Sequence, residues 1–546
     1  MSAMDRIGPV APVGSNPVLP GFHPDPSICR VGHDFYLVTS TFEYYPGLPV
    51  HHSRDLVNWR LIGHVLDRPS QLNLTGVRSS GGLYAPTIRW HQGVFYVVCT
   101  LVDPPPGSLG GNFVVTASDP AGPWSEPVWL GEPESFDPSL FFTTNLFGQD
   151  EAWFCATRPD RTSMVKGGTE IWVQSFDPEK LALTGPQHVI WHGALVDAVW
   201  AEAPHLYRTP DGDFLLVVAE GGTAHDHAMT CARSDRVIGP YRNYPRNPVL
   251  THRHLGERYP VVGVGHADLV EADDGSWWAV ALAMRTRWAE DGYHYPMGRE
   301  TFLAEVAWED GWPVVNAGVG ALREYQAGLL DTAVVYPEPS RDDFDRLDLD
   351  RHWSFVRTPS NSVLSLTERP GWLALHPQPD GINDVGCPAF ICRPQSSWEF
   401  TASGVLSFAP RNEQDVAGIV LRQNEDYSLQ LLISLAPNGQ RVARAVRRFA
   451  GIDEVMAVSP VAPGSLLLEV TADGLSYHFS VDEVPLVTLD GRGLSTTVAG
   501  GFTGTMIGPY VFAETFAELP PVAGHRGVPP VPTRPPTAYW DWFAFA

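Results

Sequence analysis

An internal repeat of about 60 residues constrains the fold of this chain more than any other feature of its sequence. Each copy has a turn residue followed by alternating aromatic and β-branched residues, as in the segment Gly32-His-Asp-Phe-Tyr-Leu-Val-Thr. The aromatic marker recurs at intervals of 60, 58, 61 and 63 residues, at Phe35, Phe95, Trp153, Phe214 and Trp277. Alternation over a short run is typical of a half-buried β-strand, so the sequence predicts five similar β units.

A second pattern follows the first at the same period: a strand that ends in Ser and Asp, and then a turn. Its four clear copies are Ser53-Arg-Asp55, Ser118-Asp119, Ser175-Phe-Asp177 and Ser234-Asp235, and a degraded copy is Trp308-Glu-Asp310-Gly-Trp312. A period of this length accommodates a four-stranded antiparallel blade with its loops. An array of independent hairpins would leave sheet faces unburied, whereas a closed ring buries each blade against its neighbours. We therefore predict an all-β chain with a five-bladed β-propeller over residues 15–322.

The remainder of the chain predicts a second domain, since 546 residues exceed what one ordinary core holds. Residues 323–340 lose the repeat and are predicted to be a linker. Residues 341–546 contain short alternating runs without the period, which favours a β-sandwich of the concanavalin-like or jelly-roll kind. The Pro-rich segment 519–537 is predicted to be an ordered meander before a closing strand at 539–544, the alternative being a disordered tail.

Composition narrows the function. The chain is 44% hydrophobic and 18% charged, as expected of a globular protein, and its 50 Pro, 51 Gly and 18 Trp favour many short strands. A formal charge of -25 argues against nucleic acid or an anionic membrane as a partner, because phosphate binding needs clustered Lys and Arg. No apolar run approaches the roughly 18 residues of a spanning helix. A neutral substrate such as a sugar is compatible with this charge.

The cysteines and the first residues bear on the cellular compartment. Six cysteines are scattered without CxxC pairs, and four lie in or beside apolar strand-like runs. This favours buried free thiols in a reducing compartment over disulfides or metal ligation. The first residues lack a basic segment followed by an apolar core, so no secretory signal is visible. We expect a cytoplasmic protein.

Candidate catalytic groups come from the phase of the repeat. Three carboxylates, Asp25, Asp137 and Glu202, lie 10, 16 and 12 residues before the marker of their repeat. If the repeats are equivalent, these acids converge near the propeller axis, as in an enzyme that cleaves glycosides. The same test adds Tyr84 and His266, each 11 residues before its marker. The five repeats would then each present one polar or aromatic group at the axis.

An Asp-Pro pair alone predicts no active site. Asp119-Pro and Asp177-Pro fall in the repeated turn, where Asp caps the backbone, so the phase carries the information rather than the letters. Glu202 lies in an apolar context that would raise its pKa, as a general acid requires. The alternative is a salt-bridged core Glu with Arg299 as its cation. For His266 a purely structural role is equally open.

Long motifs carry a resemblance to a known family. They include Asn16 to Ile28, Ser40 to Gly47, Val50 to Trp59, Glu202 to Tyr207, Gly298 to Thr301 and Gly500 to Thr505. In these motifs the chain resembles the β-xylosidases and α-L-arabinofuranosidases of glycoside hydrolase family 43, and most of all the two-domain β-xylosidase group. The resemblance implies a five-bladed propeller and a β-sandwich that partly covers its pocket.

The resemblance also implies roles for individual residues. Asp25 looks like the general base, Glu202 like the general acid, and Asp137 like the ionised carboxylate that orients Glu202 and raises its pKa by repulsion. Arg299 looks like the arginine that grips sugar hydroxyls, and we expect it to face the substrate. His266 looks like the axial histidine.

The walls of the sugar subsites follow from the same resemblance. Phe42, Phe136 and Phe502 would be apolar walls, and the segment around Phe502 would bring a residue of the second domain to the site. Tyr84 is a departure, since relatives often have Trp there. The substrate preference is therefore open, whereas the chemistry is not affected.

The implied reaction is hydrolysis with inversion, for which base and acid carboxyls lie roughly 6.5–9.5 Å apart to admit a water. We predict an exo-acting enzyme that releases xylose from the non-reducing end of β-1,4-xylo-oligosaccharides. The alternatives are an α-L-arabinofuranosidase or an enzyme with both activities. We expect no required cofactor, although a divalent cation such as Ca²⁺ could be held near His266 through water. Relatives imply a homo-oligomer, a dimer or a tetramer.

Two rival functions remain. The invertase-like class also joins a five-bladed propeller to a β-sandwich, but its Asn-Asp-Pro-Asn, Arg-Asp-Pro and Glu-Cys motifs are absent from this sequence. A non-catalytic sugar-binding propeller would keep the aromatic residues but would have no use for three axial carboxylates.

Overall fold

The computed structural model describes residues 13–131, 134–145, 147–194, 199–329, 340–514 and 535–546. Within these ranges almost all regular structure is β-strand, which confirms the predicted class, and the chain divides into two compact units, Met1–Glu338 and Pro339–Ala546. The helical elements of the described ranges are η1 (Arg253–Leu255), η2 (Arg492–Leu494) and α1 (Thr496–Ala499). None of the helices in the described part of the chain has the length and apolar character needed to cross a bilayer.

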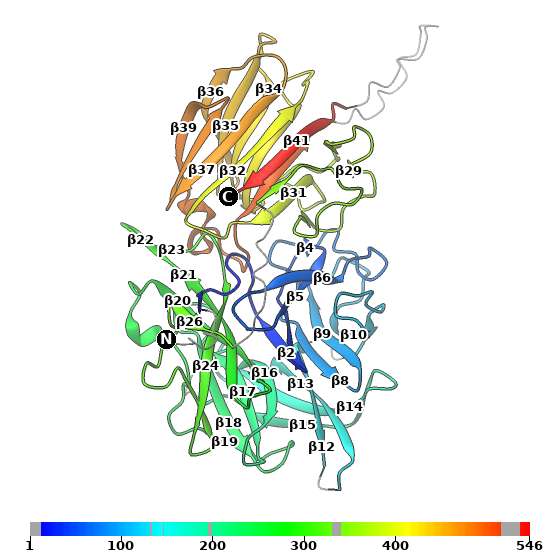
Figure 1. The fold of residues 1–546 in the computed structure, drawn as a ribbon, viewed down its shortest axis with the longest axis vertical. Coiled ribbons are helices and arrows are strands. Elements are labelled where there is room, and N and C mark those ends of the chain that lie inside the picture. Colours follow the sequence, from blue (N-terminus) through cyan, green and yellow to red (C-terminus); the bar gives the residue numbers. More distant parts are fainter. Residues whose placement is uncertain (1–12, 132–133, 146, 195–198, 330–339, 515–534) are drawn as a thin grey trace, which may run out of the picture. The chain divides into compact units, whose positions relative to one another are not determined.

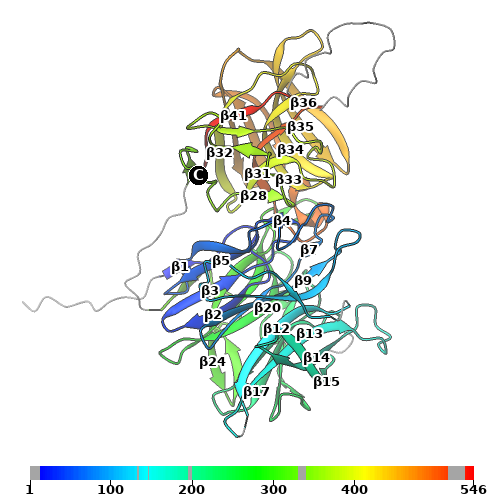
Figure 2. The same ribbon diagram turned by 90° about the vertical axis from the view of Figure 1, so that its right-hand side faces the viewer.

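The first unit contains five antiparallel sheets that follow one another along the chain, coloured from blue to green in Figure 1. Blade 1 consists of β2 (Ser27–Val31), β3 (Asp34–Val38), β5 (Gly47–Ser53) and β6 (Arg60–Leu66). Blade 2 consists of β7 (Gly82–Leu83), β8 (Thr87–His91), β9 (Val94–Val102), β10 (Gly111–Ala117) and β11 (Val128–Trp129), with β7 and β8 both paired to β9. Blade 3 consists of β12 (Phe136–Thr144), β13 (Asp150–Pro159), β14 (Thr169–Asp177) and β15 (Ala182–Trp191), seen in cyan in Figure 2.

The last two blades complete the set. Blade 4 consists of β16 (Glu202–Arg208), β17 (Phe214–Glu220), β18 (Ala228–Ser234) and β19 (Arg242–Asn243). Blade 5 consists of β20 (Val261–Glu271), β21 (Trp277–Arg285), β24 (Glu300–Glu309) and β25 (Trp312–Val315). The short strands outside the blades are β1 (Val13–Ser15), β4 (Tyr44–Tyr45), β22 (Arg287–Ala289), β23 (Gly292–His294) and β26 (Tyr325–Ala327).

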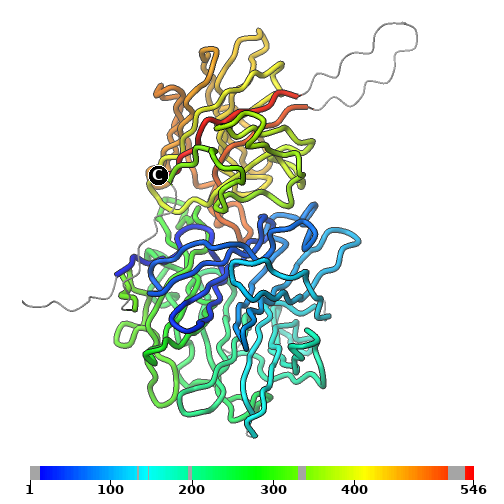
Figure 3. The backbone as a smooth tube through the Cα atoms, turned by 45° about the vertical axis from the view of Figure 1, so that its right-hand side comes forward, coloured from blue at the N-terminus to red at the C-terminus, as the bar shows by residue number. Residues whose placement is uncertain are grey.

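One strand from each blade contributes to a closed ring. β2 contacts β8, β8 contacts β12, β12 contacts β16, β16 contacts β20, and β20 returns to β2. Figure 3 follows the backbone through this succession. The five-bladed propeller is therefore confirmed, and its innermost strands are β2, β8, β12, β16 and β20.

The ring is closed by the segment that precedes blade 1. The side chain of Asn16 donates from Nδ2 to the carbonyl of Leu303 over 2.9 Å and accepts from the Leu303 backbone N–H over 2.9 Å. The backbone N–H of Val18 donates to Thr301 of β24 over 2.9 Å. β1 pairs with β26, which lies at the start of the predicted linker. These bonds join blade 5 to the segment before blade 1.

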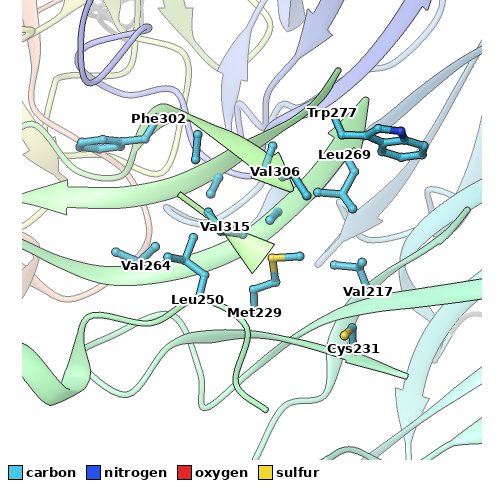
Figure 4. Close-up of a cluster of buried hydrophobic side chains, with 14 of the residues drawn as sticks. Val217, Met229, Cys231, Leu250, Val264, Leu269, Trp277, Phe302, Val306 and Val315 are labelled. Carbon is cyan, nitrogen blue, oxygen red and sulfur yellow. The ribbon is translucent and has the colours of Figure 1, made fainter. Parts of the chain in front are cut away.

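Apolar residues between the blades supply the core of the propeller. Figure 4 shows one such cluster, in which Val217 and Met229 of blade 4 pack with Leu269, Phe302 and Val306 of blade 5. Burial on both faces explains why the strands next to the inner ones, such as β9, β17 and β21, are largely continuous apolar runs rather than alternating ones. β17, for example, is buried along its whole length. The aromatic repeat markers lie in β3, β9, β13, β17 and β21, and each of these strands pairs with the inner strand of its blade.

The second unit contains two antiparallel sheets. One follows the order β29-β30-β41-β32-β37-β38-β39, with β27 also paired to β41, and the other contains β36-β35-β34-β33-β40-β31-β28. Contacts of β33 with β37 and of β40 with β41 join the sheets. The predicted concanavalin-like sandwich is confirmed, and the predicted closing strand is β41.

The strands of this unit have the following bounds: β27 (Arg341–Asp342), β28 (Ser354–Val356), β29 (Leu364–Ser365), β30 (Leu373–Leu375), β31 (Ala389–Pro394), β32 (Glu399–Ser407), β33 (Val416–Asn424), β34 (Tyr427–Leu435), β35 (Arg441–Phe449), β36 (Ile452–Pro460), β37 (Leu466–Asp473), β38 (Ser476–Val481), β39 (Val484–Asp490), β40 (Met506–Phe512) and β41 (Ala538–Phe545). The predicted Pro-rich meander lies outside the described residues as far as residue 534. The six cysteines are all free thiols, and Cys387 alone among them is only partly buried.

Candidate active site

Three of the predicted residues occupy the same position in their blades. The pairing of the inner strands aligns Ser27, Ser139 and Asp268, and the residue two places before each is Asp25, Asp137 or His266. All three of these residues have left-handed backbone dihedrals, with φ of 54°, 49° and 45°. Non-glycine residues rarely adopt this region, and each costs on the order of 1–3 kcal/mol. The same turn thus aims a different side chain from three different blades.

Tyr84 and Glu202 lie one residue earlier than this common position. The residues aligned with Ser27 in their blades are Thr87 and His205, and Tyr84 and Glu202 are three places before them. In blade 4 it is Ala203 that has the left-handed φ, at 52°, and the inner strand shifts its register between Glu202 and His205. The five repeats therefore do not all present their residue from one equivalent position. Two of the five residues lie one place earlier, because the local turn differs between blades.

Asp25 is buried and contacted from three sides. Ser40 Oγ donates to its Oδ2 over 2.7 Å, Arg299 Nη1 donates to its Oδ1 over 2.9 Å, and His266 Nδ1 lies 3.5 Å from Oδ1. Burial alone would raise the pKa of Asp25, but the positive charge of Arg299, with His266 and the Ser40 hydroxyl, lowers it. Asp25 is thus an ionised carboxylate near neutral pH and can accept a proton.

Arg299 lies at the start of the segment that enters β24 and is itself buried. Besides its bond to Asp25, its Nη1 donates to Thr223 Oγ1 over 3.2 Å, and its guanidinium lies 5.3 Å from the ring centre of Phe42. The arginine was expected to face the substrate, and one of its direct partners is instead Asp25. The charge of Arg299 also acts to lower the pKa of Glu202, but burial and the charges of Asp137 and Asp25 outweigh it.

Asp137, which is buried, and Glu202, which is partly exposed, form an interacting pair of carboxyls. Burial, with repulsion from Asp25, raises the pKa of Asp137 to about 8, although Arg299 and the Ala203 backbone N–H act in the opposite direction. Burial and the charges of Asp137 and Asp25 raise the pKa of Glu202 well above its usual range. Two like charges in one desolvated site cannot both ionise cheaply, so this pair retains a proton near neutrality while Asp25 does not. The site therefore contains a base and an acid at the same pH.

Aromatic rings adjoin Asp25 and Arg299. The ring of Phe42, which has a φ of 51°, contacts Tyr84 edge-on at 5.0 Å and lies 6.0 Å from Phe22 in a stacked arrangement. The Tyr84 hydroxyl donates to the Ser80 carbonyl over 2.8 Å. Phe42 and Tyr84 thus lie with Arg299 beside the base, as an apolar wall would.

The other predicted residues are placed less fully. Phe136 is the first residue of β12 and directly precedes Asp137. Burial lowers the pKa of His266 in spite of the nearby Asp25 charge, so its imidazole is neutral. Phe502 belongs to the second unit, between α1 and β40, and its contribution to the sugar pocket stays a prediction.

A buried polar network lies one step along the inner strands from these residues. Arg89 of β8 forms a bidentate ion pair with Asp268 of β20, at 2.8 and 3.1 Å, and its Nη2 also lies 3.0 Å from His205 Nδ1. Asp268 also accepts from Ser27 Oγ over 2.6 Å and from the hydroxyl of Tyr207. Three blades are thereby bonded to a carboxylate of a fourth. This network fixes the strands that present the candidate catalytic groups.

The repeat analysis missed several partners in the site. Ser40, Thr223 and His227 hold or adjoin Asp25 and Arg299, and none of them has the phase of the inner strands. Ser40 lies in a motif of the family resemblance, which was the one available signal. Burial, together with the nearby charges, lowers the pKa of His227 to about 3, so its imidazole is neutral.

No metal cluster surrounds His266 among the residues that the structure describes. In those ranges the group of three or more potential ligands within 4.8 Å of one another is Asp160, Glu170 and His192 in blade 3. Arg158 Nε already donates to Glu170 over 2.7 Å. A cation near His266 stays a prediction.

Comparisons with known proteins agree with this geometry. The model of "Glycosyl hydrolases family 43" matches residues 14–313, and that of the "Beta xylosidase C-terminal Concanavalin A-like domain" matches residues 341–520. A xylosidase/arabinosidase of Butyrivibrio fibrisolvens is 42% identical over 509 residues, covering 91% of this chain and 95% of the relative. A non-reducing end alpha-L-arabinofuranosidase of Bacteroides ovatus is 40% identical over 541 residues, covering 97% and 94%.

Solved structures give the same result. The crystal structure of xylan beta-1,4-xylosidase from Bacillus halodurans has a TM-score of 0.86 and 32% identity, covering 97% of this chain and 99% of that one. Both the propeller and the sandwich are thus matched, which decides against the invertase-like and the non-catalytic alternatives. This chain belongs to glycosyl hydrolase family 43 and is a glycoside hydrolase of two domains.

Proposed function

We propose that the protein is an inverting, exo-acting β-xylosidase that releases xylose from the non-reducing end of β-1,4-xylo-oligosaccharides. The feature that carries the proposal is the opposite direction of the pKa shifts of neighbouring carboxyls: the pKa of Asp25 is lowered, whereas those of Asp137 and Glu202 are raised. Relatives named xylosidase/arabinosidase and xylan beta-1,4-xylosidase support the substrate class.

In this mechanism Asp25 accepts a proton from a water molecule as the water oxygen attacks the anomeric carbon. The bond from that carbon to the glycosidic oxygen breaks, and the oxygen takes the proton of Glu202 as it leaves. The products are xylose of inverted configuration and a shortened oligosaccharide, with Asp25 protonated and Glu202 ionised until they exchange protons with water. Asp137 acts through Glu202 by disfavouring its ionised form.

The residues beside Asp25 would select the sugar. Arg299 offers donors to sugar hydroxyls once the substrate enters, and its bond to Asp25 keeps the carboxylate charged. Phe42 and Tyr84 supply an apolar wall for the ring of a pentose. Phe136 and Phe502 are proposed as further walls, and His266 as a neutral donor or acceptor at the axis.

An α-L-arabinofuranosidase, or an enzyme with both activities, is the second candidate. The relative from Bacteroides ovatus carries that name at 40% identity. Both pentoses present similar hydroxyls to the same acid and base, so the choice depends on the wall of the pocket. The tyrosine at position 84 is one feature that could shift it.

The deciding experiment is a kinetic comparison on 4-nitrophenyl β-D-xylopyranoside, 4-nitrophenyl α-L-arabinofuranoside and xylobiose. We expect the highest kcat/KM among aryl substrates on the xyloside, together with turnover of xylobiose. Proton NMR of the first-formed sugar should show the α-anomer of xylose. A preference for the arabinofuranoside without xylobiose turnover would favour the second candidate, and a first-formed β-anomer would exclude inversion.

The proposal includes no required cofactor. A divalent cation beside His266 would take most of its ligands from water, because His266 belongs to no ligand cluster of the described residues. Extensive treatment with EDTA should therefore leave kcat/KM within about twofold. A larger loss that Ca²⁺ restores would assign the cation a role.

Location and assembly complete the proposal. Six free thiols suit a reducing compartment, so we place the enzyme in the cytoplasm, which cell fractionation would test.

We also propose a dimer or tetramer. β36 ends the order of its sheet and exposes the apolar residues Ile452, Val455 and Val458, a surface that a second copy could cover. Light scattering should give twice or four times the chain mass of 59.9 kDa.

A further inference from the structure

Trp200 is an exposed tryptophan held rigidly beside the candidate acid. It precedes Glu202 by two residues, and 43% of it is exposed. Its backbone N–H donates to the Gly167 carbonyl over 2.8 Å, and the carbonyl of Val199 accepts from the Gly221 N–H over 2.9 Å. The peptide around Trp200 is thus bonded to a loop of blade 3 and to a loop of blade 4.

Two glycines lie against the indole of Trp200. A Cβ atom added to Gly167 would lie 3.1 Å from Cε2 and Nε1 of the indole, and one added to Gly222 would lie 3.5 Å from Cδ1. The ring thus packs on two glycines that have no side chains to cover it. Trp200 also has a left-handed φ of 56°. A bulky residue in this strained conformation indicates a functional constraint.

A short chain of contacts connects the indole to the catalytic groups. Gly222 lies beside the indole, and the next residue, Thr223, accepts a hydrogen bond from Arg299 Nη1 over 3.2 Å. The same Nη1 donates to Asp25 over 2.9 Å. Trp200 therefore lies at the border of the candidate active site, two residues before the acid.

The position beside the acid identifies which part of the substrate would meet the indole. The general acid must touch the glycosidic oxygen, and beyond that oxygen lies the leaving-group sugar. A xylopyranosyl ring has no hydroxymethyl group, so its two faces present C–H groups that pack well on an aromatic ring. Tryptophan offers the largest such surface of any side chain. When it stays half exposed without a ligand, the favourable free energy of burying that surface is not gained.

We infer that Trp200 is the aromatic platform for the leaving-group xylose, and thus a substrate-contact residue that favours oligosaccharides over simple alkyl xylosides. The inference rests on the proposed β-xylosidase function and adds to it the residue that recognises the second sugar. It assigns no chemical step to the indole.

Two substrates that share a leaving-group chemistry test the inference. Xylobiose and methyl β-D-xylopyranoside both need protonation of a poor alkoxide, but only xylobiose offers a sugar ring to Trp200. For Trp200→Ala we expect kcat/KM to fall on the order of 5- to 20-fold on xylobiose and to stay within about twofold on the methyl xyloside. Trp200→Phe, which keeps an aromatic face, should lose less on xylobiose.

The matched control is Trp90→Ala. Trp90 is 40% exposed but lies near the far end of β8, the strand whose first residue, Thr87, aligns with Ser27 at the site. For this variant kcat/KM should stay unchanged on both substrates. The alkaline limb of the pH profile should also stay in place in Trp200→Ala, since Glu202 is not altered.

Equal losses on the two substrates, or a shifted alkaline limb, would mean that Trp200 acts through Glu202 or the fold and would overturn the inference. Unchanged turnover of xylobiose would overturn it as well. If the wild type cleaves arabinofuranosides but not xylobiose, the proposed function fails separately. In that case the same variants are compared on methyl α-L-arabinofuranoside and on an arabinosylated xylo-oligosaccharide. A loss confined to the oligosaccharide would support the role of Trp200, and equal losses or no loss would overturn it.

Discussion

Arg299 donates a hydrogen bond to Asp25 over 2.9 Å, although the two residues are 274 positions apart in the sequence. One comes from the turn before blade 1 and the other from the turn before β24 in blade 5, so the pair forms only when the ring closes. The bond makes Asp25 the one carboxyl of the three whose pKa is lowered. This difference in pKa is why we assign the base to Asp25 and the acid to Glu202.

Replacing this arginine should shift the acid limb of the pH profile. Because Arg299 lowers the pKa of Asp25, Arg299→Met should raise that pKa, and kcat/KM should begin to fall at a higher pH than in the wild type. The lost sugar contact should also lower kcat/KM by on the order of 100-fold at the optimum. Profiles on an aryl xyloside between pH 4 and about 9 measure both effects.

Ser40→Ala is the matched variant for this test, since it removes a neutral donor from Asp25 and leaves Arg299 in place. Its acid limb should move in the same direction by a smaller amount. An acid limb that stays fixed in both variants would show that another group controls it.

Removing the charge of Asp137 should move the opposite limb. Its carboxylate raises the pKa of Glu202, so Asp137→Asn should lower that pKa, and activity should be lost at a lower alkaline pH. The burial of Glu202 remains, so the shift should be partial. An alkaline limb that moves to higher pH would contradict the proposed relation between these two carboxyls.

The role of Glu202 can be separated by leaving group. Glu202→Ala should lower kcat on xylobiose by at least about 1000-fold, because an alkoxide must be protonated as it leaves. On an aryl xyloside with an activated phenol the loss should be far smaller. Steady-state kinetics on the two substrates make the comparison, and equal losses would remove the general-acid assignment.

Breaking the buried ion pair between Arg89 and Asp268 should destabilise the fold. Arg89→Met leaves Asp268 charged, fully buried and without its principal cation, so the variant should be destabilised by about 3–5 kcal/mol. Denaturant unfolding followed by tryptophan fluorescence measures this loss. Arg161→Met removes an exposed ion pair with Glu134 and should leave the unfolding midpoint unchanged. Similar midpoints for the two variants would show that the network is not structural.

The sequence by itself determined the architecture and singled out the three candidate acids. A four-stranded blade imposes a nearly constant length on each repeat, so the markers from Phe35 to Trp277 recur at nearly equal intervals. The candidate carboxylates can therefore be found by their distance from these markers. Buried strands also leave a strong local signal in their apolar runs, which is why the propeller and the sandwich were both predicted.

Only the tertiary structure decided how the acids differ. Whether a residue projects from the common position depends on one left-handed dihedral, which is at Asp25 in blade 1 but at Ala203, after Glu202, in blade 4. The pKa values depend on burial and on charges that arrive from other blades, such as Arg299 beside Asp25. Neither quantity is local in the chain, because both arise when distant strands pack around one axis and exclude water. The repeat therefore specifies where carboxylates converge, and the closed ring specifies which of them keeps its proton.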